Sequence, residues 1–484
     1  MAPTPKHSNP PADELKTPLT HKVVMSLSSA SIVAKNALEM LSFPIYNIIL
    51  GLNPAVVSAA IAAGHGLELV IRPWIGAVSD NCKSKWGRRR PFIFWGGIAL
   101  GLSIPLLWFA PRGLAHGWLA LYLFSAITVF SVCCAIYEVP RDGLLYGLAT
   151  DRHDRVHLQA FFLAFTFAFN LLSLWMLRII QSPYFFTSTI TGLHIVALIL
   201  GAIVIPFTVL PALLVPERPQ LLADRRSGLN LIEGIKVTFA NKAFVIVCGV
   251  LTASGLANGM VAGSAVGFYI INYYVYGNDL KSAAFLAGLL GTLTSIITVV
   301  TAPIFGRLAV RIGKVALLRW GIVILIVASA SKWFTYRPEH PYATLITATL
   351  LALGYTVLML TTRSLVADIC DDDELKTGFR REGTFCAFLS WFDSGMRVVA
   401  ILLSGIVMVA VGFRRELGTN QVPEALTRMR LAFSLIPITG TVTSLVMLAF
   451  FPLTDKQTKE NQAKLLERYQ ERVDQAGRPG SRSS

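Results

Sequence analysis

Ionisable side chains lie inside apolar segments of this chain, and they are its first candidates for chemistry. They form four groups: Lys35 and Glu39; His65, Glu68 and Arg72; Glu138, Arg141 and Asp142; and Asp393 and Arg397. Placing an ionisable side chain at bilayer depth is costly, so such residues indicate a function by default. Opposite charges within a group are mostly three or four residues apart, which places them on one face of a helix.

The charges of these groups do not balance. With His65 neutral, the five acidic residues outnumber the four permanently basic ones by one. An uncompensated carboxylate in a low-dielectric cavity would bind a proton, a metal cation or a cationic group of a substrate. We expect the titrating carboxylate to be Glu68 or Glu138, coupled to Arg72 or Arg397. Protonation would release the arginine, which would then bind an acidic or hydroxyl-rich substrate.

The segments that carry these charges are long enough to cross a membrane, which takes about 20 apolar residues per helix. Twelve such segments cover approximately residues 23–50, 54–79, 91–110, 116–148, 158–182, 189–215, 243–275, 280–305, 315–333, 342–366, 383–413 and 431–453. Hydrophobic residues make up 54% of the 484 residues and charged residues only 15%, with a mean hydropathy of +0.58. Soluble domains carry about 25% charged residues. The composition therefore predicts an all-α membrane protein with twelve transmembrane helices.

The longest internal polar segment, residues 216–242, divides these spans into six and six. We expect an N-terminal six-helix half at 23–215, a central cytoplasmic loop at 216–242 and a C-terminal six-helix half at 243–453. The polar ends, residues 1–22 and 454–484, are expected to be cytoplasmic, with disorder at the N-terminus and after about residue 477. No cleavable signal precedes the first span, which we expect to act as its own targeting signal.

Lys and Arg residues are concentrated in alternate loops. The N-terminus, the loop after the second span, the central loop and the loop after the eighth span are basic, whereas the loops after the first and fifth spans contain no Lys or Arg. Basic loops stay in the cytoplasm, so both termini are predicted to be cytoplasmic. Short polar loops favour a bacterial inner membrane. Residues 414–430 disagree with this pattern, since they carry four arginines on the expected outer side.

A short pattern ends the second span of each half. Gly76 and Asp80 precede one basic cluster, and Gly306 precedes another that ends at Lys314. Val310 stands in the second copy where the acid would be. Repeated halves are typical of secondary transporters that rock about a site near the bilayer midplane.

Four stretches of the chain carry a family pattern: residues 80–92, residues 137–140 together with 151–155, residues 367–383, and residues 420–426. In these stretches the chain resembles the glycoside–pentoside–hexuronide:cation symporters, the melibiose-carrier-like branch of the major facilitator superfamily. The resemblance extends from about residue 23 to 453. It implies the major facilitator fold, with two six-helix halves around a central cavity. Fold alone does not fix the substrate.

The resemblance implies a cation site built from two acidic residues one turn apart on the second span. Glu68 falls at the first of these positions, but Arg72 falls at the second, where a guanidinium would repel Na⁺. Glu138 aligns with the acidic residue of the fourth span that contributes to sugar and cation binding in the family. These departures favour H⁺ coupling, or facilitated diffusion, over Na⁺ coupling, and no cofactor is expected.

The family's sugar contacts are not carried over intact. Asn36 and Glu39 are candidates for the acidic contact on the first span, and Arg397 for the basic residue of the eleventh, which aligns near Ser394. The basic residue at the start of the fifth span is absent at residues 159–160. The candidate substrate and cation site comprises Asn36, Glu39, Glu68, Arg72, Glu138, Arg141, Asp142, Asp393 and Arg397.

A second set of charges is expected at the cytoplasmic ends of the spans. The acidic run from Asp371 to Glu374 could bind a metal, but an expected loop position beside two arginines favours a network of gate salt bridges. A basic cluster also holds an inner loop at an anionic leaflet. The candidate gate and inner-loop residues are Asp80, Arg88, Arg89, Arg90, Asp368, Glu374, Arg380 and Arg381.

Other classes of protein find little support in the sequence. The net charge of +15 could indicate a nucleic-acid partner, but the basic residues sit mainly in short loops between spans. The six cysteines show neither metal-ligand nor disulfide spacing. No catalytic triad order and no phosphate-binding Gly-x-x-x-x-Gly-Lys-Ser/Thr loop is present, so ATP hydrolysis by this chain is not expected. The expected partners are a small-molecule substrate and the bilayer, with the chain as a monomer and not an enzyme.

The sequence therefore predicts a secondary active transporter of a glycoside, oligosaccharide or hexuronide-like solute. Four alternatives stay open. The solute could be amphipathic, such as a lysolipid, steroid conjugate or peptide, or the protein could be a facilitator without cation coupling. It could also be a non-transporting sensor, which would need a signalling domain larger than the tail at 454–484, or a membrane enzyme, which would need a reactive group of residues.

Overall fold

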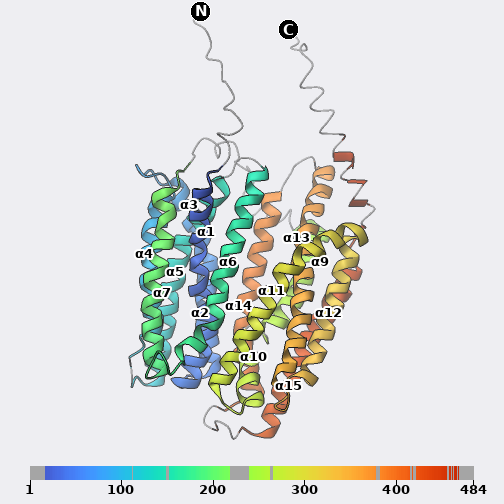
Figure 1. Cartoon of the computed structure of the whole chain (residues 1–484). Helices are drawn as coiled ribbons and strands as arrows, with labels where there is room; N and C mark the ends of the chain where they lie inside the picture. Colours follow the sequence, from blue (N-terminus) through green and yellow to red (C-terminus); the bar gives the residue numbers. More distant parts are fainter. Residues whose placement is uncertain are drawn as a thin grey trace, which may run out of the picture. The chain divides into compact units, whose positions relative to one another are not determined.

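All regular structure in the described part of the chain is helical (Figure 1). The computed structural model describes residues 17–111, 113–148, 152–217, 239–261, 265–377, 382–414, 417, 421–454, 457–458, 460–461, 463–465 and 467. In chain order the elements are α1 (Leu19–Leu27), η1 (Ser28–Ala30), α2 (Ser31–Ser42), η2 (Phe43–Ile49), α3 (Pro54–Asn81), α4 (Arg90–Trp108), α5 (His116–Leu148), α6 (Arg152–Ile180), α7 (Thr189–Leu214), α9 (Lys242–Gly259), α10 (Ala265–Tyr269), η4 (Ile270–Val275), α11 (Leu280–Ile312), α12 (Lys314–Thr335), η5 (Pro341–Ala343), α13 (Thr344–Thr377), α14 (Glu382–Ala410) and α15 (Pro423–Ala449). Here η1 and η5 are 3₁₀ helices, and η2 and η4 are π-helices.

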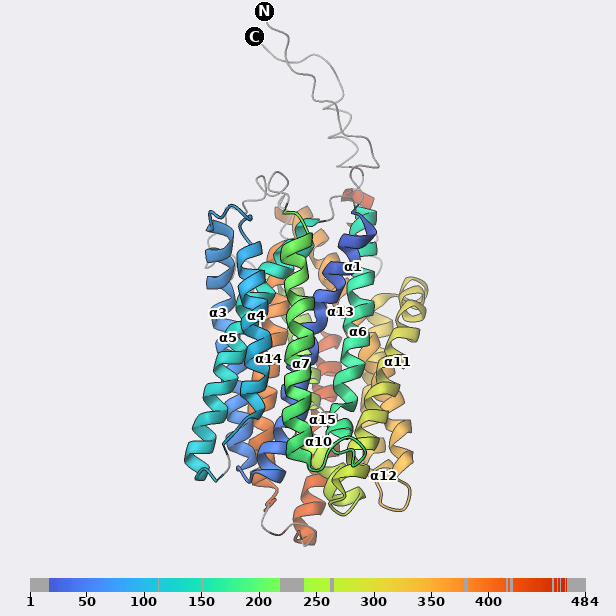
Figure 2. The same cartoon turned by 60° about the vertical axis from the view of Figure 1, so that its left-hand side comes forward.

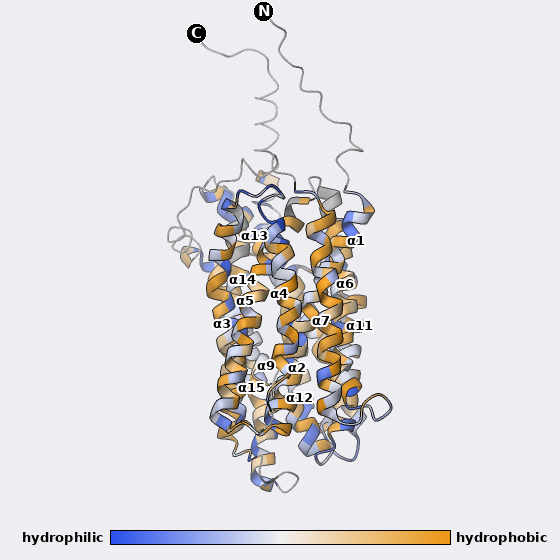
Figure 3. Cartoon of the chain, turned by 90° about the vertical axis from the view of Figure 1, so that its left-hand side faces the viewer, coloured by the Kyte–Doolittle hydropathy of each residue, from blue (hydrophilic) through white to orange (hydrophobic). Residues whose placement is uncertain are grey.

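Eleven helices within these described residues are long and apolar enough to cross a membrane. They are α3 to α7, α9 and α11 to α15. Hydrophobic residues predominate along α4 and α7 (Figure 3). The prediction of an all-α, multi-pass membrane protein is therefore confirmed.

The first expected span is not one regular helix. Residues 19–49 run through α1, the 3₁₀ segment η1, α2 and the π-helix η2. A π-helical turn also ends the seventh expected span, at η4. In each turn a fully buried asparagine, Asn47 or Asn272, donates to the loop that follows, at the carbonyl of Leu52 or the side chain of Asn278. The same device in both halves supports the internal repeat.

Two expected helix boundaries are wrong. The tenth span was expected to end at residue 366, but α13 continues to Thr377, so the acidic run 371–374 lies in a helix and not in a loop. The last span was expected to begin at residue 431, but α15 begins at Pro423. Charged side chains occupy the last turns of α13 and the first turns of α15. The apolar part of the sequence is therefore shorter than the helix in both cases.

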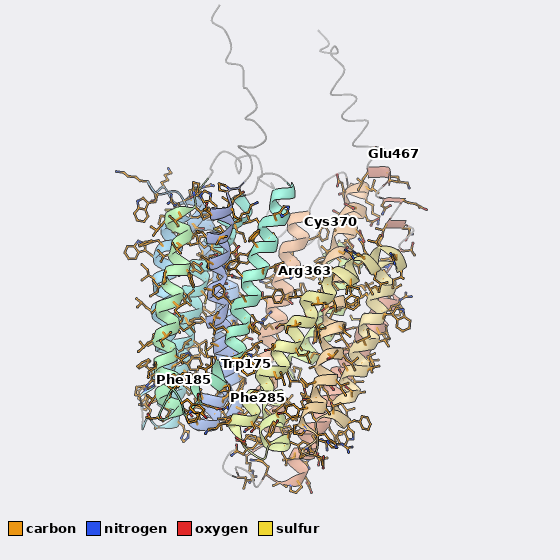
Figure 4. The ribbon with its side chains drawn as sticks, viewed as in Figure 1. Trp175, Phe185, Phe285, Arg363, Cys370 and Glu467 are labelled. Atoms are coloured by element: carbon orange, nitrogen blue, oxygen red, sulfur yellow. The ribbon has the colours of Figure 1, made fainter. Side chains whose placement is uncertain are left out.

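The chain divides into two compact units, which we describe separately. Unit 1 comprises residues 1–227 and 280–291, and unit 2 comprises residues 228–279 and 292–484. In unit 1, α4 packs against both α5 and α7, and α3 packs against α5 (Figures 1 and 2). The start of α11 belongs to unit 1, where Phe285 meets Trp175 of α6 in an edge-to-face contact with ring centroids 5.7 Å apart (Figure 4).

Helices α4 and α7 approach closely because glycines face each other at their crossing. A Cβ on Gly201 would lie 2.7 Å from the carbonyl oxygen of Gly101, which is closer than packed atoms tolerate. Small residues at such crossings are the usual way in which membrane helices pack without a hydrophobic driving force. In unit 2, Gly321 of α12 and Gly354 of α13 do the same, since a Cβ on Gly354 would lie 3.0 Å from the Gly321 carbonyl oxygen.

Gly201→Leu should therefore destabilise the protein, because it forces α4 and α7 apart; overpacking costs about 1–3 kcal/mol. The expected result is a lower apparent melting temperature in detergent. It is measured by size-exclusion chromatography of samples heated to increasing temperatures. Gly117→Leu is the matched control, since a Cβ there has no described heavy atom within 4 Å. Equal melting temperatures for wild type and Gly201→Leu would contradict the packing argument.

In unit 2, α12 packs against α13 and α15, and α9 packs against α14 and α15. The core between them includes Phe244, Leu318 and Phe385. The packing of α15 accounts for one of the four arginines of residues 414–430, which are unexpected on the outer side. Arg430 lies in α15, with its guanidinium between the rings of Tyr274 and Trp333, 4.4 and 4.3 Å from their centroids. It is a stacked structural residue, so it need not act as a topology signal.

Candidate functional site

Four serines interrupt the first span. Ser26, Ser28, Ser29 and Ser31 are all nearly fully buried. The hydroxyls of Ser26 and Ser29 donate to the carbonyls of Lys22 and Ser26, each at 2.7 Å. Such bonds back to the preceding turn compete with the regular helical pattern and bend helices. The 3₁₀ segment η1 falls at this point.

Helix α5 holds this interruption. The carbonyl oxygen of Ser28 accepts hydrogen bonds from the Tyr137 hydroxyl at 3.0 Å and from Nη1 of Arg141 at 3.3 Å. Nε of Arg141 lies 2.9 Å from the carboxylate of Asp142, and its guanidinium lies 5.3 Å from the ring centroid of Phe162. Arg141 therefore pairs with Asp142 and, together with Tyr137, anchors α5 to the broken helix.

Lys35 joins the carboxylates of two other helices. Its Nζ lies 2.7 Å from Oε1 of Glu68 on α3 and 2.7 Å from Oε2 of Glu138 on α5. Both carboxylates are buried, at 6% and 5% exposure. Lys35 thus makes its shortest ion pairs across helices and not with Glu39, which lies one turn along its own helix.

Arg72 completes this cluster. Its Nη2 lies 2.7 Å from the same Glu138 Oε2, and its Nε lies 3.5 Å from Glu68 on its own helix. The expected pair of Glu68 and Arg72 is present, but Arg72 lies closer to Glu138. The Arg72 side chain is 34% exposed, whereas both carboxylates are buried. We call Lys35, Glu68, Arg72 and Glu138 the four-charge cluster.

His65 extends the cluster toward α2. Its Nε2 lies 3.3 Å from Glu39 and its Nδ1 lies 3.8 Å from Glu68. Asn36, which lies one turn before Glu39 on α2, donates to Oδ1 of Asn170 on α6 at 2.5 Å. Asn170 was not among the expected residues. A lone amide directly after the aromatic-rich segment 161–169 was the available signal.

The charged pair of the eleventh span lies in unit 2. Asp393 and Arg397 are one turn apart on α14, with 3.9 Å between carboxylate and guanidinium. Both side chains are exposed, at 41% and 57%. They therefore form a loose surface pair within their own unit, unlike the buried four-charge cluster.

The arginines that open α4 bind the end of α7 and the segment after it. Nε and Nη2 of Arg90 donate to the carbonyls of Ala212 and Leu213, at 2.5 and 2.9 Å, which satisfies free carbonyls of the last turn of α7. The backbone N–H groups of Arg88 and Arg89 donate to Glu217 at 2.7 and 3.2 Å. These residues anchor an end of unit 1, and their gate role stays a prediction.

The candidate gate residues of unit 2 that the structure describes lie along the end of α13, and their gate role also stays a prediction. Asp368 is buried, and both of its oxygens lie 2.7 Å from Nζ of Lys314 at the start of α12. Glu374 is also buried in the last turns of α13. Arg380 and Arg381 lie outside the described residues, as does the side chain of Asp80.

Two basic residues inside the spans were not expected to matter. Lys332 of α12 is 1% exposed, and its Nζ lies 3.4 Å from the carbonyl oxygen of Phe433 and 4.5 Å from that residue's ring centroid. Pro437 has no N–H to bond this carbonyl, so the ammonium satisfies it instead. Arg363 is exposed on α13 (Figure 4).

The arrangement of helices is shared with solved transporters. A bacterial homolog of the human lysosomal transporter Spinster is similar with a TM-score of 0.64 at 12% identity, covering 94% of this chain and 99% of that one. The nucleoside transporter NupG is similar with a TM-score of 0.64 at 14% identity, covering 90% and 100%. These similarities show that the chain shares the fold of these structures.

Its family follows from the sequence match. The family described as MFS/sugar transport protein matches residues 25–455, and the chain belongs to it. Similar proteins include a putative glycoside/cation symporter of Escherichia coli (strain K12), 23% identical, with 86% of this chain and 87% of that protein covered. The isoprimeverose transporter of Lactiplantibacillus pentosus is 24% identical, with 86% and 84% covered. The expected resemblance to glycoside–cation symporters and the expected major facilitator fold are therefore confirmed, and the protein is a secondary transporter. The expectation that its substrate is a small molecule is confirmed as well.

Proposed function

We propose that this protein carries a hydroxyl-rich solute, such as a glycoside, oligosaccharide or hexuronide, by alternating access with H⁺ as the coupling ion. The observation that carries the proposal is the four-charge cluster, in which two buried carboxylates share two basic side chains inside the spans of unit 1. Relatives named for glycoside and isoprimeverose transport support the solute class. The glucuronide carrier protein homolog of Escherichia coli (strain K12), 22% identical, supports an acidic sugar among them.

Protonation of Glu138 is the coupling step. A neutral Glu138 no longer attracts Nη2 of Arg72, which now lies 2.7 Å away. The released guanidinium, already 34% exposed, would donate paired hydrogen bonds to a carboxylate or to neighbouring hydroxyls of the solute. Release of the solute returns Arg72 to Glu138, which expels the proton.

Na⁺ fits this cluster poorly. Both carboxylates already have a basic nitrogen at 2.7 Å, so a metal cation would have to displace the protein's own charges. The transporter acts without a cofactor or a catalytic step, as a monomer with no nucleic-acid partner. It lies in the cell inner membrane with both termini in the cytoplasm.

Solute counterflow in proteoliposomes tests the substrate class without assuming any coupling ion. Liposomes loaded with one unlabelled candidate are diluted into a trace of the same labelled compound, across a panel of glycosides, hexuronides, lysolipids and short peptides. Overshoot with a glycoside or hexuronide is the expected result. Overshoot with a lysolipid or peptide alone would contradict the sugar proposal and favour a carrier of amphipathic solutes.

A further inference from the structure

The ammonium of Lys35 occupies the point at which two buried carboxylates converge. It reaches from α2 to Glu68 on α3 and to Glu138 on α5, at 2.7 Å from one oxygen of each. The hydroxyl of Ser31, one turn before Lys35, lies 3.5 Å from the second oxygen of Glu138. Carboxylate oxygens from two helices therefore lie beside the ammonium, and a hydroxyl from a third contacts one of these carboxylates.

This environment has the chemistry of a site for a small hard cation, which prefers carboxylate and hydroxyl oxygen ligands. The charge balance of the cluster also agrees with a site for one monovalent cation. Glu68, Glu138, Arg72 and Lys35 are neutral as a set, so the cluster without Lys35 lacks one positive charge. One monovalent cation would restore neutrality, and its place would be that of Nζ.

We propose that Lys35 is a tethered cation that fills a latent monovalent-cation site between Glu68 and Glu138. The wild-type chain therefore binds no Na⁺ there, and removal of the Lys35 amine opens the site. This inference rests on the proposed function in one respect only, since it explains why the coupling ion is not Na⁺. Its own content is a binding property of the cluster.

The test is Na⁺ binding by purified protein in detergent, which needs neither substrate nor transport. Apparent melting temperature is measured at pH 8.5 as Na⁺ replaces choline at constant ionic strength. Lys35→Ala is expected to show a saturable rise with Na⁺, because a ligand that binds only the folded state stabilises it. Wild type and Lys35→Arg, which keeps a cation in place, should show none.

Further variants locate the site. Lys35→Met keeps most of the side-chain volume without the charge and should respond to Na⁺ as Lys35→Ala does. The double variant Lys35→Ala/Glu138→Gln should lose the response, because one of the two carboxylates is gone. No Na⁺ response in either single variant, or an equal response in wild type, would overturn the proposal. Failure of both single variants to fold even in Na⁺ would overturn it too, since the bound ion should replace the amine.

The outcome is independent of the transport assays. A wrong substrate class, or a transporter without proton coupling, would leave the Na⁺ response of Lys35→Ala unchanged. Conversely, an absent response would remove the tethered-cation role of Lys35 and leave proton coupling through Glu138 to be judged by its own experiment.

Discussion

Glu138→Gln is expected to abolish uptake driven by a pH gradient, down to the level of protein-free liposomes. The amide keeps the size of the side chain but can neither bind nor release a proton, so the coupled cycle stops. Counterflow, which exchanges solute without net proton movement, should persist because the amide resembles the protonated acid. The readout is the initial rate of labelled solute uptake with an acidic exterior.

The variant should still fold. Removing one partner of a buried ion pair costs about 3–5 kcal/mol when the other charge is left alone. Here Lys35 keeps Glu68 at 2.7 Å, and Arg72 keeps Glu68 at 3.5 Å and is partly exposed. Glu138→Asp, which still titrates, is the matched control and should retain coupled uptake at a reduced rate. Undiminished proton-driven uptake by Glu138→Gln would remove Glu138 from the mechanism.

Arg72→Gln is expected to weaken the binding of an acidic sugar by about 10- to 100-fold, because a hydrogen bond to a charged group contributes about 1.5–3 kcal/mol. A neutral glycoside has no carboxylate to lose this contact, so its affinity should fall less. The measurement is the dissociation constant of each ligand by calorimetry with purified protein.

Arg72→Lys separates charge from geometry in this prediction. Lysine keeps the positive charge but lacks the planar fork that binds a carboxylate through two parallel hydrogen bonds. Intermediate affinity for the acidic sugar is therefore expected. Equal affinity of wild type and Arg72→Gln for both ligands would show that this guanidinium does not contact the solute.

The charged groups were visible in the sequence, but their pairing was not. Spacing of three or four residues predicts neighbours on one helix, and Lys35 and Glu39 fit that pattern. In the folded unit the buried carboxylates of two other helices lie nearer to Lys35, and Glu39 lies next to His65. Contacts between helices depend on helix rotation, which hydropathy alone does not determine.

The break in the first span was also missed, although its signal was present. Four serines within residues 26–31 can bond to carbonyls of the preceding turn, and the 3₁₀ segment η1 lies among them. Hydropathy does not detect such a break because buried serine is tolerated inside a span. The all-helical, multi-pass fold was predictable because segment length and apolar composition decide it, although eleven and not twelve helices among the described residues are long and apolar enough to span. The family was predictable from the four stretches that carry its pattern.

The most direct test of proton coupling is substrate-dependent proton movement in proteoliposomes, followed with a pH-sensitive dye outside. The substrate is the compound that gives counterflow, added in choline buffer free of Na⁺ with the membrane potential clamped. External alkalinisation in wild type, unchanged by Na⁺ and absent in Glu138→Gln, is the predicted result. Uptake that requires Na⁺ and moves no protons would contradict the account, because transport would then be coupled to Na⁺ and not to protonation of Glu138.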